Sequence, residues 1–135
     1  IIKEANALNY EKGIAGCIVG HPMGGTVGGF WGLLYGRKIR LIIPVGLEKE
    51  TASDIQTVSN LTIEENPGNS LMPMTGIIIT EIEAIKELTG ADVYQMAAGG
   101  IRGAEGAVRL LVEGTHEQIK KVKNIISDIE HENPF

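Results

Sequence analysis

The residue types best suited to chemistry in this chain lie in a glycine-rich segment, GHPMGGTVGG, at residues 20–29. The segment follows an apolar run of strand length and precedes a run of helix length, so it is expected to form a strand-to-helix turn. Glycines let the backbone approach a ligand closely, and free N–H groups at a helix start attract anions. The turn therefore predicts a site for a phosphate or carboxylate group. The residues expected to bind it are Gly20, His21, Gly24, Gly25 and Thr26.

Two well-known motifs come close to this segment, and each fails at the residue that performs the chemistry. The nucleophile elbow of the α/β-hydrolases, G-x-S-x-G, needs a serine where Pro22 stands. Acyl transfer through such an elbow is therefore excluded. The P-loop, G-x-x-x-x-G-K-[ST], matches at Gly20 and Gly25 but has Thr26 in place of its lysine. Nucleoside triphosphate chemistry of this kind is not expected.

A second glycine-rich turn, AAGGIRGAEGA at residues 97–107, follows much later in the chain. Arg102 at its tip could clamp a phosphate or carboxylate between Gly100 and Gly103. Glu105 is a candidate general base. The alternative is a hairpin turn whose glycines serve only to adopt positive φ angles.

His21 and Cys17 are the other reactive side chains near the first turn. His21 is a candidate acid or base, and the alternative is that it only hydrogen-bonds to the turn backbone. Cys17 lies within an apolar run and is expected to be an inert core thiol. No cluster of cysteines and histidines is present, so no metal site is expected, and the sequence identifies no cofactor.

The elements that must position these residues follow from hydrophobic periodicity and capping signals. Three capping boxes are indicated, at Thr51 with Asp54, Thr80 with Glu83, and Thr115 with Gln118. Apolar runs and amphipathic stripes supply the rest. The expected elements are a helix at 2–12, strands at 14–20 and 39–45, helices at 25–36 and 51–60, a loop at 64–74, strands at 76–79, 93–98 and 107–113, and helices at 80–90 and 115–130.

This order predicts an α/β fold, a three-layer sandwich with a mostly parallel sheet that ends in an antiparallel hairpin. Residues 14–45 are expected to form a β–turn–α–β unit with both strands central in the sheet. The final hairpin with its glycine-rich turn resembles the C-terminal domain of pyruvate kinase, over the topology of residues 14–113. The resemblance implies an α/β sheet finishing in a hairpin whose turn can contribute to ligand binding.

Length and composition limit the class of protein. The 135 residues, 43% hydrophobic, suit one domain over 1–135, and the initial Ile is compatible with an N-terminally truncated fragment. The net charge of −5 argues against nucleic-acid binding, yet residues 1–45 carry five basic and two acidic side chains. An anion site is thus expected in the first third. The single cysteine and the absence of a signal peptide favour a cytoplasmic protein.

Glycines repeat every four residues along the second predicted helix, at Gly24, Gly28, Gly32 and Gly36. Such a smooth stripe can lie close to a sheet or to a second copy, so a homo-oligomer is expected. The uncharged stretch 13–36 is long enough to span a bilayer, which needs about 20 residues. Because a His-Pro pair and nine glycines interrupt it, no membrane span is expected.

Three functions stay open on these grounds. The first is a small-molecule binding domain for a phosphate- or carboxylate-bearing ligand. The second is a small enzyme that uses the same pocket, with His21 or Glu105 as acid or base. The third is a structural or oligomerisation domain in which the glycines serve packing alone.

Overall fold

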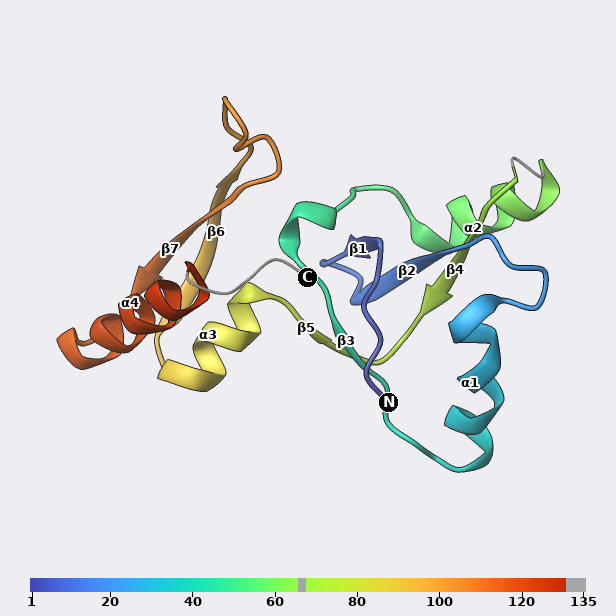
Figure 1. Ribbon diagram of the computed structural model, residues 1–135, viewed down its shortest axis with the longest axis horizontal. Coiled ribbons are helices and arrows are strands. Elements are labelled where there is room, and N and C mark those ends of the chain that lie inside the picture. The colour runs from blue at the N-terminus through green and yellow to red at the C-terminus, as the bar shows by residue number, and fades with distance from the viewer. Residues whose placement is uncertain (66–67, 131–135) are drawn as a thin grey trace. The chain divides into compact units, whose positions relative to one another are not determined.

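The computed structural model describes residues 1–65 and 68–130, and the chain divides into two compact units, Ile1–Thr80 and Glu81–Phe135. Each unit is described by itself (Figure 1). Unit 1 contains β1 (Ala7–Asn9), β2 (Ile14–Val19), α1 (Gly25–Gly36), β3 (Ile42–Pro44), the short 3-10 helix η1 (Leu47–Lys49), α2 (Ile55–Glu64), β4 (Ser70–Met74) and β5 (Ile77–Ile79). Unit 2 contains α3 (Glu81–Thr89), β6 (Asp92–Ala98), β7 (Val108–Glu113) and α4 (His116–Glu130).

The predicted mixture of helices and strands is confirmed, whereas the predicted three-layer sandwich with a mostly parallel sheet is wrong. The strands form three small sheets, ordered β1-β2-β4, β3-β5 and β6-β7. Only the β3-β5 pair among the described strands is parallel. β2 and β3 therefore do not share a sheet as the predicted β–turn–α–β unit required. A continuous apolar run indicates a buried strand but carries no information on the direction of its neighbours.

The antiparallel sheet of unit 1 contains two segments whose predicted structure is wrong. The expected helix at 2–12 is absent from the described residues there; β1 pairs with β2 instead, with Leu8 opposite Ala15. The expected loop at 64–74 contains β4, which covers the other edge of β2. Pro73 is tolerated because β4 is an edge strand, where a missing N–H need not break a ladder. Part of the loop prediction, Asn66-Pro67, lies outside the described residues.

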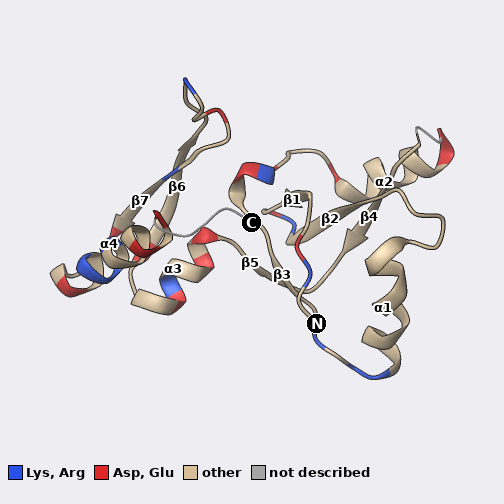
Figure 2. Ribbon diagram, viewed as in Figure 1, with Lys and Arg blue, Asp and Glu red and all other residues tan. Residues whose placement is uncertain are grey.

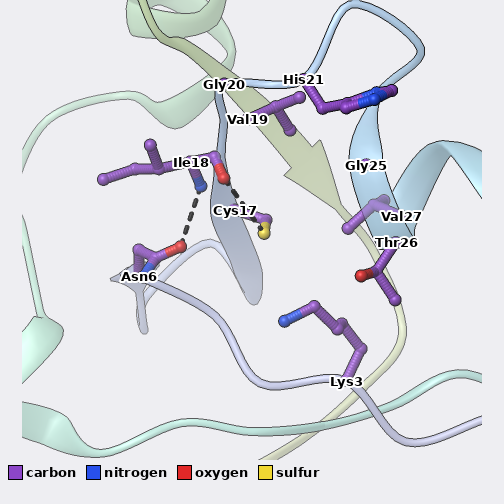
Figure 3. A pocket seen from close by; sticks show the side chains of 11 residues that line it. Lys3, Asn6, Cys17, Ile18, Val19, Gly20, His21, Gly25, Thr26 and Val27 are labelled. Atoms are coloured by element: carbon purple, nitrogen blue, oxygen red, sulfur yellow. Dashed lines mark hydrogen bonds between the residues drawn. The ribbon is translucent and has the colours of Figure 1, made fainter.

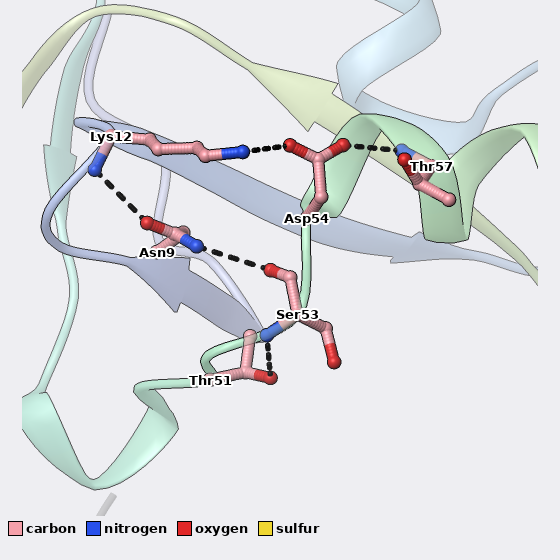
Figure 4. A network of polar contacts seen from close by, with 6 residues as sticks. All are labelled: Asn9, Lys12, Thr51, Ser53, Asp54 and Thr57. Carbon is pink, nitrogen blue, oxygen red and sulfur yellow. Dashed lines mark hydrogen bonds and ion pairs between the residues drawn. The ribbon is translucent and has the colours of Figure 1, made fainter.

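Helix α2 packs close to β2 at Gly16. A Cβ on Gly16 would lie 2.9 Å from Leu71 Cδ1 and 3.3 Å from Ile55 Cγ2, so a larger residue would require these two side chains to shift. The helix starts at Asp54, whose carboxylate accepts the Thr57 N–H at 2.7 Å and also pairs with Lys12 (Figure 4). The cap is thus Asp54 rather than the predicted Thr51 box.

The core of unit 1 is built from aliphatic side chains. Its largest fully buried members are Leu8, Ile43, Leu47, Ile55, Met74 and Val27. Val27 is the residue through which the start of α1 enters this core. Because the side chain of Val27 is buried, the start of α1 is anchored in unit 1.

Unit 2 follows the sequence more closely. β6 and β7 form the predicted antiparallel hairpin, with an irregularity between Gln95 and Ala97. The capping box at the start of α4 is confirmed: Thr115 N–H donates to Gln118 Oε1 at 2.7 Å, and Gln118 N–H donates to Thr115 Oγ1 at 3.3 Å. α3 ends at Thr89 and is followed by Gly90, whose φ of 73° is the left-handed value that favours glycine. The single domain predicted over 1–135 stays a prediction.

Candidate functional site

The turn between β2 and α1 is held by its own hydrogen bonds. Gly24 N–H donates to the His21 carbonyl at 2.9 Å, and Met23 N–H donates to His21 Nδ1 at 3.1 Å. Gly24 and Gly25 both have left-handed φ angles, 80° and 57°. Side chains rarely adopt such angles, which explains why two glycines stand at this place. The imidazole thus hydrogen-bonds to the turn backbone, and in its neutral form Nε2 carries the ring proton.

The start of α1 has the features of an anion-attracting helix end. Its N-cap, Gly24, has no side chain to accept hydrogen bonds from the first turn, and no acidic residue stands in that turn. The N–H groups of the first turn are the ones an α-helix leaves without an intrahelical partner, and they form the positive end of its dipole. An anion at this end would accept hydrogen bonds from these N–H groups and interact favourably with the positive end of the dipole.

A cavity of about 200 Å³ lies beside this helix start (Figure 3). Lys3 extends into it, with its ammonium group between Asn6 and Thr26. The lining residues come from the N-terminal segment, β2, the turn and the first turn of α1. They are Lys3, Asn6, Cys17, Ile18, Val19, Gly20, His21, Gly24, Gly25, Thr26 and Val27.

The electrostatic balance of this cavity is positive. Lys3 is the one formally charged residue among the described residues that line it, and its side chain is only 15% exposed. Its ion-pair partner, Glu4, is not part of that lining and is 70% exposed. The hydrogen bond from Lys3 lowers the pKa of the Glu4 carboxyl, with help from the backbone N–H of Glu4. The cavity side of the pair is therefore cationic.

The first group of predicted site residues is brought together here. Gly20, His21, Gly24, Gly25 and Thr26 all line the cavity.

The second group belongs to unit 2, in the turn between β6 and β7, so the structure does not unite it with this cavity. These residues are Gly100, Arg102, Gly103 and Glu105. Arg102 has a φ of 55° and Gly103 one of 93°, and a Cβ on Gly100 would lie 2.7 Å from the Ala104 Cβ. The geometry of a tight turn is thus sufficient to account for Gly100 and Gly103, in line with the alternative that this segment is only a hairpin turn.

Six lining residues were not assigned to a site from the sequence, and three of them, Lys3, Asn6 and Cys17, have polar or reactive side chains. Lys3 and Asn6 were read as part of a helix, and only the excess positive charge of residues 1–45 pointed toward the first of them. Asn6 Oδ1 accepts the Ile18 N–H at 2.9 Å, which ties the N-terminal segment to β2. Cys17 is buried as predicted, at 6% exposure, yet it also lines the cavity.

The glycine stripe of α1 divides into two halves with different surroundings. A Cβ on Gly28 would lie 2.2 Å from the Met23 carbonyl oxygen, so this glycine lets the turn fold onto the helix. A Cβ on Gly32 or Gly36 would meet nothing within 4 Å. Packing within unit 1 therefore explains Gly28 and leaves the other two open.

No group of three or more His, Cys, Asp or Glu side chains suited to a metal ion occurs in residues 1–65 and 68–130. None of the helices there is both long and apolar enough to cross a bilayer.

Comparison with protein-family models, curated proteins and solved structures found no match to this chain. The resemblance of residues 14–113 to the pyruvate kinase C-terminal domain stays a prediction.

Proposed function

We propose that unit 1 binds a small molecule through a phosphate or carboxylate group, in the cavity between Lys3 and the start of α1. The observation that carries this proposal is the cavity's composition. A largely buried ammonium group and an uncapped helix start border one space, and no carboxylate belongs to its described lining. Both features favour an anion, the ammonium group through its charge and the helix start through its N–H groups and dipole.

The ligand's anionic group would receive hydrogen bonds of several kinds. Lys3 Nζ supplies a charge-assisted donor, the first-turn N–H groups supply aligned backbone donors, and the Thr26 hydroxyl supplies another. The Nε2–H of His21 is a further donor on a lining residue. Left-handed glycines at 24 and 25 leave no Cβ to block the approach.

The proposal is tested by removing the positive charge of Lys3, and a control variant loses one positive charge elsewhere, so that both variants have the same net charge. Inorganic phosphate, pyrophosphate and acetate are titrated calorimetrically into the wild-type chain, Lys3→Gln and Lys12→Gln. Lys12 is the control because it pairs with Asp54 and does not belong to the cavity's described lining. A charge-assisted contact is worth about 1.5–3 kcal/mol, so Lys3→Gln is expected to weaken binding about 10- to 100-fold.

Lys12→Gln is expected to leave the anion affinity unchanged. Equal weakening by the two variants would reduce the effect to net charge and overturn the proposal. So would the absence of binding by all three anions to the wild-type chain.

A second candidate function is self-association through α1. The helix carries no charged residue, as Figure 2 shows, and it buries only Val27 and Leu34. Leu33 is 44% and Tyr35 67% exposed, beside the open surface at Gly32. A homo-oligomer through this face predicts that sedimentation gives a dimer at tens of micromolar and that Gly32→Lys returns it to a monomer. A wild-type monomer at that concentration would refute it.

A further inference from the structure

One face of α4 combines a shallow hollow with an uncompensated positive charge. The hollow measures about 180 Å³, and its described lining consists of His116, Ile119, Lys120 and Lys123. Spacings of three, four and seven residues place these side chains on one side of an α-helix. The capping box at the helix start fixes the first turn, and with it the position of His116. The hollow is thus lined by two lysines and a histidine together with one apolar side chain.

The charge on this face is not balanced within the described parts of the chain. Neither Lys120 nor Lys123 forms an ion pair with any of residues 1–65 and 68–130. By contrast, the neighbouring Lys121 has its Nζ 3.6 Å from the Glu117 Oε1, one turn earlier. Figure 2 shows basic segments of α4 with acidic segments before and after them along the helix.

We propose that this face, His116–Lys120–Lys123, is a second anion site, for the phosphate groups of a small molecule. Phosphate fits because its several oxygens can accept from two ammonium groups and an imidazole at once. A phosphate group also carries more negative charge than a single carboxylate, so two ammonium groups attract it more strongly. All three basic side chains are exposed, so the contacts are solvent-screened and the affinity is expected to fall as salt rises. The site lies in unit 2 and does not depend on the function proposed for unit 1.

Adjacent lysines provide a matched test. Inorganic pyrophosphate is titrated into the full 15N-labelled chain at constant ionic strength, and backbone amide shifts are followed by NMR. Saturable shifts are expected in residues 116–123, and the amides of residues 20–27 report the unit 1 cavity separately. The variants are Lys120→Gln and Lys121→Gln, which remove the same charge from neighbouring positions of one helix. Glutamine keeps a similar helix propensity, so both variants should fold.

Lys120→Gln is expected to weaken binding at residues 116–123 at least fivefold, and Lys121→Gln less than twofold. Equal weakening by both would mean that only the helix's total charge matters and would overturn the proposal. Shifts that do not saturate, or that chloride reproduces, would also overturn it. Because shifts at residues 20–27 are read independently, failure here is distinguishable from failure of the unit 1 site.

Discussion

Gly28 and Gly32 allow the two roles of the glycine stripe to be separated by one substitution, glycine to alanine, in one helix. At Gly32 the added Cβ meets nothing within 4 Å. Alanine there restricts the unfolded chain and favours the helix, so Gly32→Ala is expected to raise the free energy of unfolding by about 0.5–1 kcal/mol.

Gly28→Ala brings the same helix propensity but adds a clash. Its Cβ would stand 2.2 Å from the Met23 carbonyl oxygen and 3.1 Å from the carbonyl carbon, both backbone atoms that cannot rotate away. Moving the turn or the helix to relieve such overpacking costs about 1–3 kcal/mol. Because the propensity gain is common to both variants, this cost is also the expected difference between them. The displaced turn lines the cavity, so Gly28→Ala should weaken phosphate binding and Gly32→Ala should not.

The measurement is urea denaturation followed by tryptophan fluorescence. Trp31 is the chain's single tryptophan and lies in α1, so its signal reports unit 1. Free energies of unfolding that agree within about 0.5 kcal/mol for the two variants would refute the contact between Gly28 and the turn. A large loss of stability in Gly32→Ala would refute the open surface at that position.

Three further predictions concern charged side chains. Lys12 lowers the pKa of Asp54 from about 3.8 to about 2, so the ionised carboxylate stabilises the fold fully above pH 3.8, and this stabilisation is lost as the pH falls through about 2. Asp54→Asn should flatten that part of the stability profile, measured by urea denaturation from pH 2 to 5. Glu4→Gln removes the competitor for Lys3 and should tighten calorimetric phosphate binding by up to about fivefold. Lys38, at φ 54° just after α1, occupies a position that favours glycine, so Lys38→Gly should raise the free energy of unfolding by about 1 kcal/mol.

Each of these has a contrary result. An Asp54→Asn profile parallel to wild type down to pH 2 would contradict the ion pair. Unchanged or weaker phosphate binding in Glu4→Gln would mean that Lys3 does not serve the anion. Destabilisation by Lys38→Gly in denaturation would mean that the lysine side chain makes contacts that outweigh its backbone strain.

Helices with strong boundary signals could be predicted from the sequence. α1 spans the expected 25–36, because His21-Pro22 and the glycines that follow end the preceding strand. The C-terminus of α1 is also fixed by a local interaction. Ile39 N–H donates to the Leu34 carbonyl at 3.0 Å, and this hydrogen bond ends the helix in a Schellman motif. Local signals of this kind act within a few residues, so they can be read without knowing the fold.

Pairing between distant segments could not be read in the same way. Leu8 lies in a stretch whose composition favours a helix, yet it is fully buried on a strand that pairs with β2. Turn signals around Gly68 favoured a loop, but the residues that follow form β4, the edge strand that pairs with β2. In both places tertiary pairing overrides local propensity, and the apolar partner, β2, gave no indication of which segments it would join.

The same limit explains why half of the candidate site was missed. The glycines of the turn can be recognised in the sequence because they lie within a few residues of one another. Gly24 and Gly25 adopt left-handed φ angles that only glycine accepts easily. Lys3 is fourteen residues from Cys17, the first residue of β2 that lines the cavity. It reaches the cavity because the N-terminal segment pairs with β3 at Ile2 and Ile42 and continues into β1, which pairs with β2. With residues 2–12 read as a helix, the lysine had no predicted neighbour. An anion site assembled from a local turn and a distant cation is therefore half visible in a sequence: the backbone that shapes it can be predicted, while the charge that would decide its affinity depends on the pairing of strands.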